Sequence, residues 1–186
     1  EHVDGEGQVR AANRLPVAGG GPPPGGDPEW DLARHPPRGA PRDDALLGLG
    51  QPGRIALNFC RQAKSAEKAL LSALSDVKAA LPEAVLIEAA PDFVGLSDVA
   101  DSVGVTRQNL RKLMLQHHAS FPLPIHEGKA VMWHLSDMLR WLQQKMAYKV
   151  SESDLQLAEV TKQVNLAKAL PAVNKQLLKD MKPLIY

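Results

Sequence analysis

The chain has 186 residues, which is enough for one or two small domains with a buried core. Its 22 basic and 21 acidic side chains nearly balance, which excludes a strongly basic protein of the histone type. Binding to nucleic acid would therefore have to come from a local patch. Aromatic residues make up 4% of the chain, which argues against aromatic platforms that stack single-stranded bases.

A single cysteine, Cys60, excludes an intrachain disulfide framework and a cysteine zinc site. The sequence contains no apolar run of about 18 residues and no signal-peptide pattern. We therefore expect a cytoplasmic protein that does not enter a membrane.

Glycine and proline are concentrated in residues 1–42, which include the run at 19–26. Because neither residue supports a helix or the interior of a strand, we predict that residues 1–42 form a disordered leader. Two interpretations remain open for it: a native leader, or a wrong-frame translation ahead of an intact protein, which the change of composition at Asp43 suggests. Translating the other two frames of the coding DNA upstream of Asp43 distinguishes them.

Residues 43–91 begin with a predicted pair of strands. Ala45–Leu49 is a short apolar run, and residues 51–53 are a turn signal. In Arg54–Phe59 apolar residues alternate with polar or small ones, as they do in a half-buried strand.

A helix and a further strand are predicted next. Ser65 can cap an amphipathic helix whose apolar residues recur every three or four positions until Pro82 stops it. Residues 84–88 predict a buried strand, and Cys60 is expected to be a small buried residue. The resulting ββαβ module matches the last four elements of a ferredoxin-like β-α-β-β-α-β unit. The composition of residues 1–42 is not expected to supply the missing first strand and helix.

Residues 96–113 predict a helix-turn-helix. Ser97 is a good N-cap for a first short helix, and Gly104 permits the left-handed turn that ends it. Thr106 caps a second helix, in which Leu110 is expected to point into the core. These local choices all agree with two helices packed across a tight corner.

The outward face of this second helix is cationic and rich in amides. Steps of about 100° per residue from Leu110 place five polar side chains away from the core: Arg107, Gln108, Asn109, Arg111 and Lys112. No acidic residue occurs between Ser102 and Pro124. Arginine can pair with guanine, glutamine or asparagine with adenine, and lysine with phosphate. The alternative is an ordinary solvated helix face.

The following segment predicts a hairpin and another helix. Residues 121–124 carry two prolines and cannot be helical, and Glu127 and Gly128 form a turn signal before an apolar segment at 129–133. Ser136 is expected to cap a helix that contains Trp141. In this order the parts resemble the MerR/excisionase-like winged helix-turn-helix family, including small prophage regulators of the AlpA type, over about residues 92–145.

The resemblance implies that the second helix enters the major groove and that the hairpin, or wing, contacts the DNA backbone or the minor groove. It further implies groove contacts by Thr106, Arg107, Gln108, Arg111 and Lys112, and wing contacts by His126 and Lys129. The wing is poor in arginine. Asn109 joins the expected DNA-binding residues because it lies on the shoulder of the same helix.

Other chemistry is not indicated. The histidines at 117, 118, 126 and 134 lack the spacing and the companion ligands of a metal site, and His117 and His118 are interpreted as the end of the second helix. The sequence contains no phosphate-binding glycine loop and no nucleophile elbow. We expect neither an enzyme nor a bound cofactor or metal.

From Ser151 onward the chain is predicted to be helical. Leu157, Val160, Val164 and Ala167 follow a 3-4-3 spacing. This stripe is expected either to receive the helix of a second copy in a homodimer, or to pack back on its own domain.

The sequence therefore predicts an α+β protein in four parts: the leader at 1–42, the ββαβ module at 43–91, a winged helix-turn-helix at 92–148 and a helical tail at 149–186. The expected function is sequence-specific binding of double-stranded DNA through residues 106–115, as a transcriptional regulator or prophage-type accessory factor. The alternative is a non-enzymatic adaptor that uses the same fold to bind a protein partner.

Overall fold

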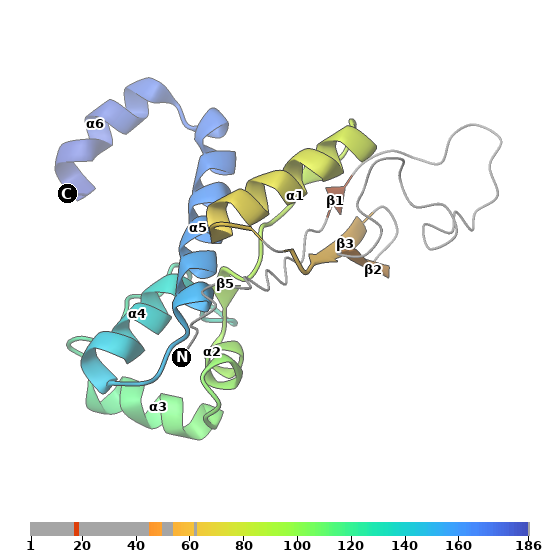
Figure 1. Ribbon diagram of the computed structural model, residues 1–186. Helices are drawn as coiled ribbons and strands as arrows, with labels where there is room; N and C mark the ends of the chain where they lie inside the picture. Colours follow the sequence, from red (N-terminus) through yellow and green to blue (C-terminus); the bar gives the residue numbers. More distant parts are fainter. Residues whose placement is uncertain (1–16, 19–44, 50–53, 62, 186) are drawn as a thin grey trace, which may run out of the picture.

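The computed structural model describes residues 17–18, 45–49, 54–61 and 63–185, and it has a mixed α+β architecture (Figure 1). Its strands are β1 (Val17–Ala18), β2 (Ala45–Leu49), β3 (Arg54–Phe59), β4 (Val85–Leu86), β5 (Phe93–Val94) and β6 (Trp133–His134). Its helices are α1 (Ala66–Ala80), α2 (Leu96–Ser102), α3 (Arg107–Gln116), α4 (Leu135–Met146), α5 (Glu152–Ala169), the 3₁₀ turn η1 (Leu170–Ala172) and α6 (Lys175–Ile185).

Four strands form an antiparallel sheet in the order β2-β3-β1-β4. The predicted alternation in β3 is confirmed, because Ile55, Leu57 and Phe59 all belong to one apolar cluster while Asn58 is exposed. Helix α1 packs on this face of the sheet through residues that include Ala73. The predicted order of strand, strand, helix and strand over 45–86 is therefore observed.

Three expectations for this part need correction. Val17–Ala18 supplies a strand that bridges β3 and β4, although its segment was expected to supply none; the rest of the predicted leader lies outside the described residues. The predicted buried strand at 84–88 shrinks to β4, in which Val85 is 62% exposed, because Ala89 turns away to bond with α5. Cys60 is exposed just after β3 rather than buried.

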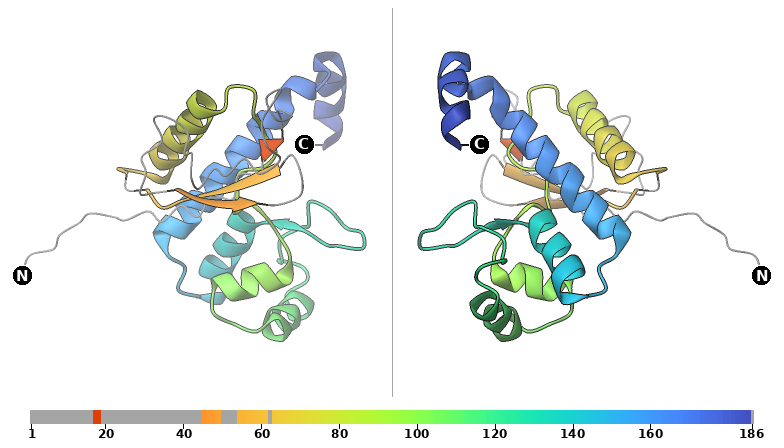
Figure 2. Two further views of the ribbon diagram at one scale, coloured as in Figure 1. Left: turned by 90° about the vertical axis from the view of Figure 1, so that its right-hand side faces the viewer. Right: turned by 90° about the vertical axis from the view of Figure 1, so that its left-hand side faces the viewer.

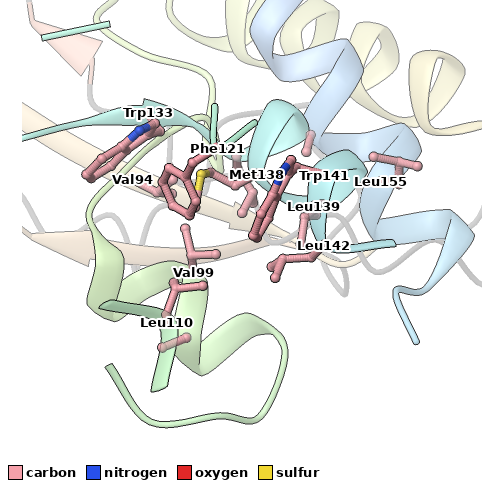
Figure 3. Packing of buried hydrophobic residues seen from close by; sticks show 13 residues of the cluster. Val94, Val99, Leu110, Phe121, Trp133, Met138, Leu139, Trp141, Leu142 and Leu155 are labelled. Atoms are coloured by element: carbon pink, nitrogen blue, oxygen red, sulfur yellow. The ribbon is translucent and has the colours of Figure 1, made fainter. Parts of the chain in front are cut away.

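The second core joins α2, α3 and α4 to the small β5–β6 sheet. Leu110, Met138 and Leu142 are fully buried in it, and the Phe121 ring lies edge-on to the indoles of Trp133 and Trp141 (Figure 3). Since burying such side chains is the main favourable term in folding, this cluster is what fixes α3 against its neighbours.

Helix α5 lies between the two cores. Leu155 and Ala158 belong to the cluster of α4, whereas Leu157 and Val164 pack in clusters shared with α1. The predicted apolar stripe of Leu157, Val160, Val164 and Ala167 packs within its own chain. Helix α1 covers most of it, and only its last residue, Ala167, is exposed.

A buried polar network ties α5 to the segment that connects the two cores. The Asn165 side chain accepts a hydrogen bond from Ala89 N and donates to Ala89 O and to Asp92 Oδ2, each at 2.8 Å. Asp92 Oδ1 lies 2.7 Å from His134 Nδ1, and Thr161 donates to Pro91 O at 2.7 Å. The network therefore holds both cores to one helix.

Among the residues that the structure describes, no helix combines the length and the apolar character needed to cross a bilayer.

Candidate nucleic-acid interface

The corner between α2 and α3 is built as the sequence predicts, except at its start. Gly104 adopts φ 69°, the left-handed conformation that glycine tolerates best, and Val105 N donates to Ala100 O at 2.9 Å. The predicted cap Ser97 is wrong: α2 begins after Gly95, whose N–H donates to Asp98 Oδ2 at 2.8 Å. Asp98 thus caps the helix from its third position, and Ser97 stays in the first turn.

Helix α3 is capped by Thr106, as predicted, whose hydroxyl oxygen accepts from Asn109 N at 3.1 Å. Leu110 is fully buried, and Leu113 and Met114 pack partly buried against the same core. Since these residues fix the rotation of the helix about its axis, the opposite face must point to solvent.

The outward face is uncovered. Every residue of the predicted set on α3 and at its cap is exposed: Thr106, Arg107, Gln108, Asn109, Arg111 and Lys112. Within the described part of the chain, Arg107, Arg111 and Lys112 take part in no ion pair. Three unpaired cations and two free amide side chains thus share one surface.

The hairpin after α3 differs from the prediction. The segments around the turn meet only at His126 and Met132, whose backbones form a single antiparallel bridge. Trp133 then leaves the hairpin and pairs with Val94 of β5, because its ring is drawn into the core and its Nε1 donates to Pro122 O at 3.0 Å. Residues 126–132 therefore form a loop that protrudes from the body (Figure 2).

Helix α4 starts two residues earlier than the sequence predicts. Its N-cap is His134, and Ser136 lies buried in the first turn instead of capping it. The start is set by tertiary structure, because Leu135 N donates to Asp92 O at 2.8 Å and His134 is paired with the side chain of Asp92.

A groove of about 620 Å³ runs between α3 and the protruding loop. Arg107 and Arg111 line it from the helix, and Lys129 lines it from the loop. Asp98 and Glu127 also border it, but the Asp98 carboxylate is engaged by the N–H of Gly95. The structure thus brings Lys129 to the same groove as the two arginines, whereas exposed His126 does not line it.

His118 also lines this groove, although it was not among the predicted site residues. Helical spacing could not have shown this, because α3 ends at Gln116 and His118 lies in the turn that follows. The predicted end of α3 is confirmed at His117, whose ring lies 6.0 Å from that of Trp141. In the described residues no three His, Cys, Asp or Glu side chains come together as a metal site.

Comparison with protein-family models, with curated proteins and with solved structures finds no match to this chain.

Proposed function

We propose that this chain binds double-stranded DNA in a sequence-dependent manner, with α2, α3 and the 126–132 loop acting as a winged helix-turn-helix. The observation that carries the proposal is the exposed, unpaired set of Arg107, Arg111 and Lys112 beside the amides of Gln108 and Asn109. An α-helix fits the major groove, where arginine can recognise guanine and the amides can recognise adenine.

The groove between α3 and the loop supports this geometry. Because the side chains of Arg107, Arg111 and Lys129 converge on it from two sides, a phosphate backbone in the groove would be contacted from both. Phosphate contacts of this kind fix the register of a protein on the duplex, and base contacts from α3 then give the sequence preference. The role that follows is that of a transcriptional regulator or a prophage-type accessory factor.

The first experiment measures the affinity for duplex DNA as a function of salt, after selection of bound sites from random duplexes. If Arg107, Arg111, Lys112 and Lys129 each contact one phosphate, the log–log slope should be about −3.6. Affinity should then fall roughly 150-fold between about 50 and 200 mM salt. Absence of salt-dependent binding to any selected duplex would refute the proposal.

A matched pair of triple variants separates a specific surface from general charge. Replacing Arg107, Arg111 and Lys112 by alanine should abolish selective binding. Replacing three lysines elsewhere, Lys64, Lys68 and Lys78, all exposed, should leave it nearly unchanged although it removes the same charge. Equal binding by both variants would instead favour an adaptor.

The adaptor is the second candidate because apolar side chains are exposed outside the DNA-facing surface. Leu177 and Leu184 of α6 are 55% and 82% exposed. A protein that uses only this surface would retain its partner when the α3 cations are removed, and it would bind no duplex.

A further inference from the structure

The C-terminal part of the chain carries a continuous exposed apolar surface. Every residue from 166 to 184 is exposed, and the large apolar side chains among them are Leu166, Leu170, Val173, Leu177, Leu178, Met181 and Leu184. Apolar surface in such a run is unusual for a segment that remains in water. The segment is therefore a candidate for docking.

Helix α6 is strongly amphipathic. Leu177, Leu178, Met181 and Leu184 stand at positions i, i+1, i+4 and i+7 and share one face. Lys175, Lys179 and Lys182 lie on the other side. The helix has its own cap, because Asn174 Oδ1 accepts from Gln176 N and Leu177 N, each at 3.0 Å. It is thus formed as an independent element with an uncovered apolar face.

The same chain also presents an unfilled groove. A hollow of about 600 Å³ lies between α1, α4 and α5, with Leu71, Val160 and Ala167 among its apolar lining. Leu71 is 51% exposed there. Leu71 and Ala167 are thus apolar groups of this groove that the chain leaves open to solvent.

Charge and length match the helix to the groove. Three acids border the groove, Glu67, Asp137 and Glu159. Asp137 and Glu159 are paired with Lys162 and Arg140, but Glu67 has no ion-pair partner among the described residues and can meet a lysine of α6. The apolar face from Leu177 to Leu184 is about 10 Å long, and the groove floor along α5 from Glu159 to Ala167 is about 12 Å long, at a rise of ~1.5 Å per residue.

The orientation of α6 indicates which copy of the groove it fills. Pro171 lies in the η1 turn that follows α5, and only Val173 and Asn174 separate that turn from α6. In Figures 1 and 2, α1 lies against one side of α5, and α6 extends from the C-terminal end of α5 toward the other side. Since α1 is a wall of the groove, α6 points away from the groove of its own chain.

We infer that α6 docks in the α1–α4–α5 groove of a second copy of this chain, and that the second copy returns its own α6. Such an exchange is symmetric, so both grooves and both helices are filled in one closed dimer. The occupant of the groove is therefore the Leu177–Met181–Leu184 face of the partner, with Lys182 at the edge of that face toward Glu67.

Cysteine cross-linking distinguishes exchange between chains from folding back. In a Cys60→Ser background, Gln163→Cys is placed in the groove of one protein and Met181→Cys on α6 of another. Mixing them under mild oxidation should give a covalent heterodimer. A control mixture of Met181→Cys with Leu123→Cys, an exposed position that lines the α3 groove and not the α1–α4–α5 groove, should give much less. A double Gln163→Cys/Met181→Cys protein that closes only within one chain would overturn the inference.

Sedimentation of the full chain tests the energetics. A dimer at micromolar concentration is expected, and Leu177→Ala should weaken it by roughly 100-fold, because each dimer loses the contact twice. Glu67→Lys and Lys182→Glu should each weaken it, because Lys182 lies beside the edge of the apolar face, and the two together should restore much of the loss. Leu123→Ala is the control and should change nothing. A monomer at tens of micromolar, or a dimer that is indifferent to Leu177→Ala, overturns the inference and leaves DNA binding to be judged separately.

Discussion

Replacing Asn165 by alanine should destabilise the protein more than any other single change of a polar residue on α5. The Asn165 side chain is 5% exposed and makes three hydrogen bonds of 2.8 Å, two to the backbone of Ala89 and one to Asp92. Ala89 and Asp92 are 0% and 1% exposed, so water cannot replace the lost partner without rearrangement. Each buried group left unsatisfied costs about 1–3 kcal/mol, and more if it is charged.

The summed cost for Asn165→Ala is about 3–9 kcal/mol, a large share of the roughly 5–15 kcal/mol that stabilises a typical domain. Urea unfolding followed by the fluorescence of Trp133 and Trp141 measures it, and the midpoint should fall by roughly 1–3 M. Two controls lie on the same helix. Thr161→Val removes the bond to Pro91 and should cost about 1 kcal/mol, and Leu166→Ala, at an exposed site, should cost less than about 0.5 kcal/mol. If Asn165→Ala resembles Leu166→Ala, the network does not hold the cores together.

Three further changes test other parts of the reasoning. Burial and the carboxylate of Asp92 raise the pKa of Glu88 above its ordinary 4.5, so ionised Glu88 opposes folding at neutral pH. Glu88→Gln should therefore raise the urea midpoint at pH 7. The gain should vanish in acid, where Glu88 is protonated in both the folded and the unfolded protein. At Gly104 no atom lies within 4 Å of an added Cβ, so Gly104→Ala should cost only backbone strain, about 1 kcal/mol. A larger loss of stability by thermal melting would contradict the open space around this glycine. Arg107→Glu should abolish duplex binding yet stabilise the isolated protein by about 0.3–1 kcal/mol at low salt, because it places an anion at the positive end of the α3 dipole. Lys145→Glu, in the last turn of α4, should destabilise the protein for the opposite reason. Equal effects of the two changes on the melting temperature would contradict the helix-dipole argument.

Features set by local backbone chemistry were predictable from the sequence. The corner glycine, the Thr106 cap and the inward Leu110 are all observed, because each depends on a few neighbouring residues. The exposed face of α3 followed directly, since the buried positions of a helix determine the opposite ones. The exposure of Arg107, Arg111 and Lys112 could therefore be predicted before the surroundings of α3 were known.

Features set by tertiary pairing were not predictable in the same way. Strands β1 and β5 are two residues long and exist only because distant segments pair with them. The start of α4 was displaced because the backbone and side chain of Asp92 bond to Leu135 and His134, which are more than forty residues away. The polar network on α5 left one trace in the sequence: Thr161 and Asn165 interrupt an otherwise apolar stripe, and such interruptions can indicate buried hydrogen bonding.

The charges of α3 oppose the stability of the helix that carries them. The first turn of α3 has no acidic residue and begins with Arg107, so a cation stands at the positive end of the helix dipole, where it costs about 0.3–1 kcal/mol. Arg107 and Arg111 are four residues apart, and like charges at this spacing cost about 0.2–0.5 kcal/mol more. No acid among the described residues neutralises them. A polyanion placed against this surface would reverse both terms, because the same cations would then gain a partner. The electrostatic energy of these cations is therefore unfavourable in the free protein and favourable in the proposed complex. This change of sign is expected of a binding site and not of a solvated helix face.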